Sequence, residues 1–199
     1  MAMGDKAADT VGKLKAHIVT NVSGVSDPLL TQTIHRAGSE WMRLARVWRE
    51  TLSLGDLEDE VYTFNLEQDE AYRARVNPLM WVKIDGTAIE RLYYTLNEPA
   101  SAGEPQTLTL LAPYNTLADG DVTARVVWVP MFDASEEPDW VWANFGGYIA
   151  DLAIGRLLRM PRKPWTDVAY GADLEGLALA HAMRTRSEAE RNDPQEVIP

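Results

Sequence analysis

The spacing of apolar residues changes twice along this chain of 199 residues. Between residues 27 and 49 the apolar side chains recur at steps of three and four, which is typical of one face of a helix. They are Ile34, Ala37, Trp41, Leu44 and Trp48. From Val61 the period falls to two, as in strands with one buried face, and helical spacing returns at Asp139. The pattern therefore predicts helices on either side of a block of strands.

Capping residues indicate where the two main helices begin. Asp27 can accept hydrogen bonds from free amides and Pro28 suits the first helical position, so a helix is expected from there to about Arg49. Asp139 can cap the second helix in the same way. That helix is rich in small residues: Gly146, Gly147, Ala150 and Gly155. Glycine weakens a helix, so we expect a neighbouring backbone to approach this one closely in compensation.

The segment "RLLRMPRKPW", residues 156–165, is basic and stiff in an otherwise acidic chain. Pro161 and Pro164 must end the preceding helix, because proline lacks an amide proton and biases the residue before it away from the helical region. A last helix should then begin near Thr166 or Asp167. We call "MPRKPW", residues 160–165, the elbow and expect it to set the direction of that last helix.

The middle of the chain predicts antiparallel strands. Asp85 and Gly86 lie between two apolar runs, which is a strong hairpin signal because both turn positions favour positive φ. Residues 107–111 and 122–129 are expected to form a second strand pair across the connection 112–121. These strands predict one small antiparallel sheet.

Together these elements predict an α+β chain that is mainly α: a helical bundle with an inserted small antiparallel β-sheet domain and an extended C-terminal helix and tail. The expected parts are the N-terminal bundle helices (1–52), an acidic β insertion (53–137), a bundle helix with the elbow (138–165), and the C-terminal helix with a flexible tail (166–199).

Charge is concentrated in the middle of the chain. The net charge is −11, and residues 53–139 hold 17 acidic but only five basic side chains. Such a field repels phosphate, which argues against a protein that binds nucleic acid by neutralising its backbone. Two acidic clusters stand out: Asp56, Glu58, Asp59 and Glu60, then Glu67, Asp69 and Glu70. Neither has the spacing of a calcium loop, so solvated loops are expected.

The residues of common catalytic and metal sites are absent or scattered. The chain has no cysteine, and its three histidines, His17, His35 and His181, lie on three separate expected helices. No Gly-rich phosphate loop or serine nucleophile motif occurs. We therefore expect no enzyme, no metal and no cofactor. The sequence also lacks an apolar run long enough for a membrane span or a signal peptide, so we expect synthesis inside the cell and no membrane association.

Four stretches, in this order, resemble the head-to-tail adaptor (connector or gatekeeper) proteins of tailed bacteriophages, particularly short-tailed ones. They cover nearly the whole chain: "DPLLTQTIHRAGSEWMRLARVWRETL", "LMWVKIDGTAIE", "LTLLAPYNTLADGDVTARVVWVP" and "EEPDWVWANFGGYIADLAIGRLLRMPRKPWTD". The last contains the most distinctive motif, L-L-x-x-P-x-K-P-W-x-D.

This resemblance implies a structural virion protein without catalysis. Such adaptors form a ring, usually of twelve copies, beneath the portal ring of the capsid, and they join the portal to a tail nozzle or another tail protein. The expected partners are thus the portal, a tail protein and further copies of this chain. DNA would pass through the channel without specific binding. The expected location is the neck of the virion, after assembly in the host cytoplasm.

By their position, several residues become candidates for these contacts. The portal-binding candidates are Arg159, Arg162, Lys163, Trp165, Arg184, Arg186, Arg191, Val197 and Ile198. Pro161 and Pro164 are the structural elbow, which would let the last helix leave its own bundle for the portal, with Trp165 stapling the turn. The acidic candidates that would face the channel and repel DNA are the seven residues of the two clusters.

A second interpretation places the chain in a different functional class. The chain could be a monomeric acidic binding module, such as a regulator or an inhibitor that mimics nucleic acid through its central carboxylates. A DNA mimic would compete with DNA for a basic partner and would ignore portals.

Overall fold

A computed structural model describes residues 4–57, 62–66, 74–99, 104–117, 119–130 and 139–192. The chain divides into two compact units. Within the described residues, the helical unit comprises 4–47, 130 and 139–192, and the β unit comprises 48–57, 62–66, 74–99, 104–117 and 119–129.

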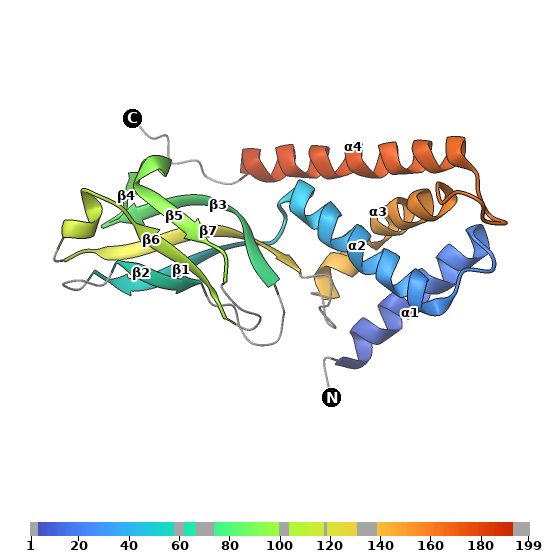
Figure 1. Ribbon diagram of the computed structural model, residues 1–199, viewed down its shortest axis with the longest axis horizontal. Coiled ribbons are helices and arrows are strands. Elements are labelled where there is room, and N and C mark those ends of the chain that lie inside the picture. Colours follow the sequence, from blue (N-terminus) through green and yellow to red (C-terminus); the bar gives the residue numbers. More distant parts are fainter. Residues whose placement is uncertain are drawn as a thin grey trace. The chain divides into compact units, whose positions relative to one another are not determined.

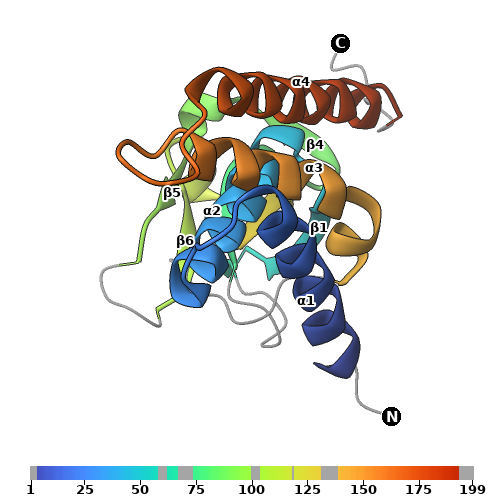
Figure 2. The ribbon, with the colours of Figure 1, turned by 90° about the vertical axis from the view of Figure 1, so that its right-hand side faces the viewer.

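The helical unit is built from four helices in the described part of the chain: α1 (Gly4–Asn21), α2 (Asp27–Ala45), α3 (Asp139–Leu158) and α4 (Val168–Asn192). The central helix is α3, which packs against α1, α2 and α4. Within this unit α4 lies along α2 and α3, and α1 lies on the opposite side of α3 (Figures 1 and 2).

The core of the helical unit is built from apolar side chains of all four helices. Its fully buried side chains include Ile18, Ile34, Trp41, Ile149, Leu152 and Leu157. Removing such side chains from water is the main favourable term for this packing, at about 1.5–3 kcal/mol for each large aliphatic residue. The apolar stripe predicted from Ile34, Ala37 and Trp41 is therefore the buried face of α2.

The end of α2 differs from its prediction. Arg46 adopts a left-handed conformation with φ 51°, and its amide donates to the Met42 carbonyl over 2.8 Å. This cap closes the helix at Ala45, and Arg49 begins a strand. The predicted helix end at Arg49 is therefore wrong, and Trp48 packs in the core of the β unit rather than on the α2 stripe.

The β unit contains two antiparallel sheets. Its strands are β1 (Arg49–Asp56), β2 (Thr63–Leu66), β3 (Ala74–Ile84), β4 (Thr87–Ile89), β5 (Tyr94–Asn97), β6 (Gln106–Leu110) and β7 (Asp121–Pro130). One sheet has the order β1-β7-β3-β4 and the other the order β2-β6-β5. Two 3-10 turns, η1 (Arg91–Tyr93) and η2 (Tyr114–Thr116), connect strands within the unit.

The hairpin predicted at Asp85 and Gly86 is confirmed. Both residues have positive φ, 50° and 77°, and β3 pairs with β4 so that Val82 lies opposite Ile89. The predicted pairing of residues 107–111 with 122–129 is wrong. β6 pairs with β2 and β5, whereas β7 pairs with β1 and β3 in the other sheet. The connection between β6 and β7 carries η2 rather than a tight hairpin turn.

These observations correct the expected fold class. The structure is 51% helical and 29% strand, with four helices, two antiparallel sheets and no closed barrel in its described parts, so it is an α+β fold rather than a mainly α bundle with one small sheet. The last helix is not extended away from the bundle either, because α4 packs against both α2 and α3. The elbow turns α4 back onto its own unit.

Candidate interaction surface

The elbow is fixed by hydrogen bonds to Thr166, the residue that directly follows it. Thr166 Oγ1 donates to the Met160 carbonyl over 2.6 Å and accepts from the Lys163 amide over 3.1 Å. Arg162 takes a left-handed conformation with φ 58°, which is uncommon outside glycine and reverses the chain within a few residues. Pro161 and Pro164 are exposed. The two prolines therefore restrict the backbone of the turn, and the hydrogen bonds of Thr166 close it.

Trp165 holds the elbow to two other parts of the helical unit. Its indole Nε1 donates to the Leu157 carbonyl, 3.1 Å away near the end of α3. Its ring also lies over Gly24 in the turn between α1 and α2, where a Cβ would be 3.8 Å from a ring carbon. The side chain is half-buried. Trp165 therefore ties together the end of α3 and the α1–α2 turn.

Asp167 caps the start of α4. Its Oδ1 accepts from the Tyr170 amide over 3.1 Å, and its own amide donates to the Leu158 carbonyl over 2.9 Å. The cap satisfies a free amide of the first helical turn, so α4 begins at Val168, close to the predicted start.

Two glycines set how closely α3 and α4 cross. A Cβ added at Gly155 would lie 2.7 Å from the Gly171 carbonyl oxygen, and a Cβ at Gly171 would lie 2.7 Å from the Gly155 carbonyl oxygen. Any side chain at either position would force the helices apart. The close approach predicted from the small residues of α3 is confirmed at Gly155. Gly171 was not predicted, although it too is a glycine inside an expected helix.

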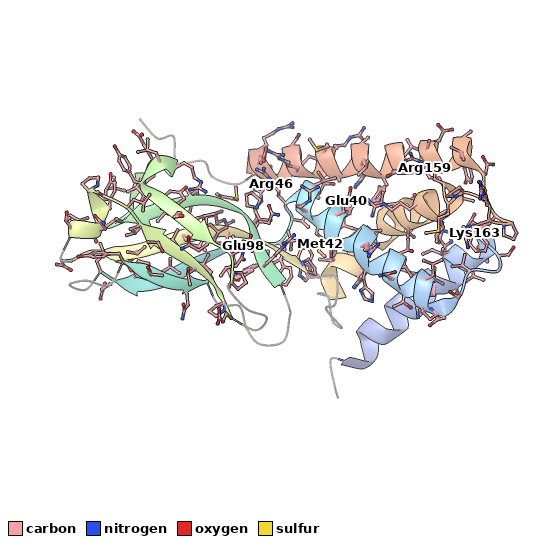
Figure 3. All side chains as sticks on the ribbon, in the orientation of Figure 1. Glu40, Met42, Arg46, Glu98, Arg159 and Lys163 are labelled. Atoms are coloured by element: carbon pink, nitrogen blue, oxygen red, sulfur yellow. The ribbon has the colours of Figure 1, made fainter. Side chains whose placement is uncertain are left out.

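A network of ion pairs joins three helices beside this crossing. Arg156 Nη2 donates to Glu40 Oε2 of α2, and its Nε lies 3.9 Å from Glu175 Oε1 of α4. Arg159 Nη1 donates to the second oxygen of Glu175. Glu40 and Arg159, with Lys163 in the elbow, are labelled in Figure 3. Arg159, a portal-binding candidate, is therefore engaged within its own unit, although half of its side chain is exposed.

Aromatic rings connect the same three helices farther along α4. His181 stacks on Tyr148 of α3 with ring centroids 3.3 Å apart, and it lies 6.0 Å from the Trp41 ring of α2. Burial lowers the pKa of His181, and the charge of Arg184 lowers it further, whereas Glu188 acts in the opposite direction. The imidazole is thus favoured in its neutral form. The sequence placed these rings on separate helices and gave no sign of their contact.

The remaining basic candidates differ in their surroundings. Arg162, Lys163, Arg184 and Arg191 are exposed. Arg186 donates to Glu190 over 2.7 Å, and that carboxylate also accepts from Arg46 over 3.4 Å. Val197 and Ile198 lie outside the described residues. The elbow and the outer side of α4 therefore present the exposed positive charge among the candidates.

Of the seven acidic candidates, Asp56 alone lies in the described part of the chain. It is exposed at the end of β1, opposite Asp121 of β7. Asp85 Oδ1 accepts from the Asp121 amide over 2.9 Å, and Asp119 is exposed nearby in the chain. We call these four residues the acidic edge of the β unit. The other acidic candidates, Glu58, Asp59, Glu60, Glu67, Asp69 and Glu70, lie outside the described residues.

A group of side chains suited to hold a metal ion is absent from the described residues. Within those same residues, each helix is too short or too polar to cross a membrane. No protein-family model matches the chain, and no curated protein matches it significantly.

Proposed function

We propose that this protein is a structural component of a tailed-phage virion, a head-to-tail adaptor without catalytic activity. Copies of the chain form a ring of about twelve subunits, in which one subunit's surface meets a different surface of the next. The ring joins the portal of the capsid to a tail nozzle or another tail protein in the neck of the virion. Assembly takes place in the host cytoplasm.

One observation carries this proposal: a fixed basic corner on an acidic chain. Arg162 and Lys163 are exposed in the elbow and form no ion pair with any described residue, although the chain as a whole carries a net charge of −11. The hydrogen bonds of Thr166 and Trp165 hold this corner in one shape. A surface that is already ordered loses little entropy on binding, so the corner suits docking onto an acidic partner such as the portal.

The order of elements also supports the proposal. Helices, β strands, a glycine-rich helix, a proline elbow and a final helix follow one another in the order that the resemblance implies. The acidic candidates are proposed to line the channel, where negative charge repels the phosphates of passing DNA and prevents it from sticking.

The proposal is tested with the purified portal ring of the same phage and two matched charge reversals. The variant R162E/K163E changes the elbow, and R36E/R43E makes the same change at two exposed arginines of α2. We expect the elbow variant to bind the portal at least about tenfold more weakly and the α2 variant to bind normally. Equal binding by both variants would remove the elbow from the contact.

The acidic edge of the β unit favours a second candidate, the acidic binding module. Four exposed carboxylates at one end of a sheet suit a basic partner that otherwise binds DNA. Under this alternative, the native protein displaces DNA from such a partner. The variant D85N/D119N/D121N, which neutralises three carboxylates of the acidic edge, does not. A protein that binds portals and leaves protein–DNA complexes intact would exclude it.

A further inference from the structure

The outer face of α4 is more apolar than its position on the surface requires. Two large apolar side chains of this face, Tyr170 (49% exposed) and Leu177 (68%), are seven positions apart and so lie on the same side of the helix, whereas Val168 and Met183 are exposed on other sides of it. Small exposed residues lie between them: Ala169, Ala172, Gly176 and Ala180. Inside the unit α4 packs through Gly171, Ala178 and Ala182 instead. The apolar outer face is therefore available for another protein surface.

Asp173 and Arg184 are two of the charged residues on this face. Asp173 and Arg184 are both exposed, and neither forms an ion pair with a described residue. They are eleven positions apart, or about 16 Å along the helix. That spacing is close to a whole number of helical turns, so both side chains lie on the same side of α4 as Leu177 and Ala180.

The positions of these two charges indicate that the outer face of α4 binds a second copy of the chain. If two α4 helices pair antiparallel about the midpoint between Asp173 and Arg184, each Asp173 lies opposite Arg184 of the other copy. The same register places Leu177 opposite Ala180, and Gly176 allows the backbones to approach closely, because a Cβ there would meet nothing within 4 Å in its own chain. A parallel pair would instead place like charges side by side.

We propose that the free protein is an antiparallel dimer through the outer faces of two α4 helices. The contact is isologous, meaning that both copies use the same surface. The pair between Asp173 of one copy and Arg184 of the other therefore forms twice, on either side of an apolar centre. Its role rests on the proposed function: the dimer covers Arg184 before assembly, and docking on the portal requires that it dissociate. The dimer itself is tested without any portal, so its failure and that of the adaptor proposal are separate results.

The test is the mass of the isolated protein by light scattering, with charge reversals at the paired positions. We expect the native chain to have twice the 22.2 kDa of one copy. D173K alone and R184D alone should be monomers, because each places like charges opposite one another and weakens the dimer at least about 100-fold. An equimolar mixture of the two variants should restore the dimer, since each reversed residue then meets its complement.

Two further variants separate this contact from general surface effects. L177E should give a monomer with an unchanged circular dichroism spectrum, because Leu177 is exposed in the single chain. L92E changes an equally exposed leucine of the β unit, and it should leave the dimer intact. Any of three results would overturn the proposal. The native chain could be monomeric at every concentration, the mixture of D173K and R184D could stay monomeric, or the mass of the native protein could be unchanged in every α4 variant.

Discussion

Gly155 and Gly171 cross so closely that neither can carry a side chain without moving a helix. A Cβ at either position would lie 2.7 Å from the other residue's carbonyl oxygen. Since α4 follows the elbow, this crossing and the elbow together determine where the outer face of α4 points.

The first prediction concerns this crossing. G155A and G171A should each lower the free energy of unfolding by about 1–3 kcal/mol, because the added methyl group forces α3 and α4 apart. G147A, in the same helix as Gly155, should leave stability unchanged or raise it by about 0.5–1 kcal/mol, since a Cβ there meets nothing within 4 Å. Urea denaturation measures all three. Equal effects at Gly155 and Gly147 would contradict the close crossing.

Trp165 gives a prediction about the stiffness of the elbow. W165F keeps an aromatic ring over Gly24 but removes the indole donor to the Leu157 carbonyl. Stability should fall by about 0.5–1.5 kcal/mol, the net value of one hydrogen bond. Amide hydrogen exchange should accelerate across the elbow and stay unchanged in β3. Trp140 is partly exposed, so W140F serves as the control. Unaltered exchange in the elbow of W165F would show that the bond does not hold it.

In the β unit, Gln106 links the two sheets. Its Oε1 accepts from the Val76 amide of β3 and its Nε2 donates to the Val76 carbonyl over 3.4 Å, although Gln106 itself belongs to β6. Q106L should destabilise the protein by about 1–3 kcal/mol, because a buried amide and carbonyl lose their partner. Gln106 Nε2 also donates to Glu98 Oε2 over 3.3 Å, so Q106E sets a buried carboxylate beside a second carboxylate and should cost at least as much as Q106L. A glutamate variant as stable as the native chain in thermal unfolding would contradict the assignment of these bonds.

A pH dependence follows from the stacked imidazole. Burial lowers the pKa of His181 below its usual 6.5, so the unfolded chain binds a proton more readily than the folded one. Stability from this residue is therefore complete at neutral pH and is lost as the pH falls through about 6.5 and then through the lower folded pKa. H181F keeps a ring against Tyr148 but cannot be protonated, so this loss should disappear from its urea midpoints. An unchanged pH dependence in H181F would contradict the account.

Local features of the sequence predicted the local structure well. The start of α4 follows from its cap Asp167, and the hairpin follows from Asp85 and Gly86. These signals are strong because capping groups and positive φ restrict a few neighbouring residues directly. The helices α2 and α3 also begin at Asp27 and Asp139, but the predicted capping role of Asp27 is wrong, because the N-cap of α2 is Ser26 and it has no side-chain cap hydrogen bond. The end of α2 was missed because the backbone of Arg46 is left-handed, a conformation that an arginine in the sequence does not predict.

Contacts between distant segments were harder to predict. The period of two identified β6 and β7 as strands, but it carries no information about which strand each one pairs with, so the two sheets were expected as one. On α4 the spacing of Tyr170, Leu174, Leu177 and His181 predicts one apolar face, but only Leu174 and His181 pack inside the unit, and the fully buried positions are Gly171, Ala178 and Ala182. Hydrophobic periodicity favours large residues and overlooks an interface made of small ones. The acidic edge was missed for a different reason, because strand pairing brings Asp56 and Asp85 to Asp121 from distant parts of the chain.

The proposed adaptor function requires that copies of this chain form a ring that docks on the portal. The most direct test is electron microscopy of the protein mixed with the portal ring of the same phage, with each component imaged alone. We predict a second ring stacked on the portal in the mixture, and a loss of that ring with R162E/K163E but not with R36E/R43E. Portals that remain bare beside a protein of unchanged mass would contradict the claim.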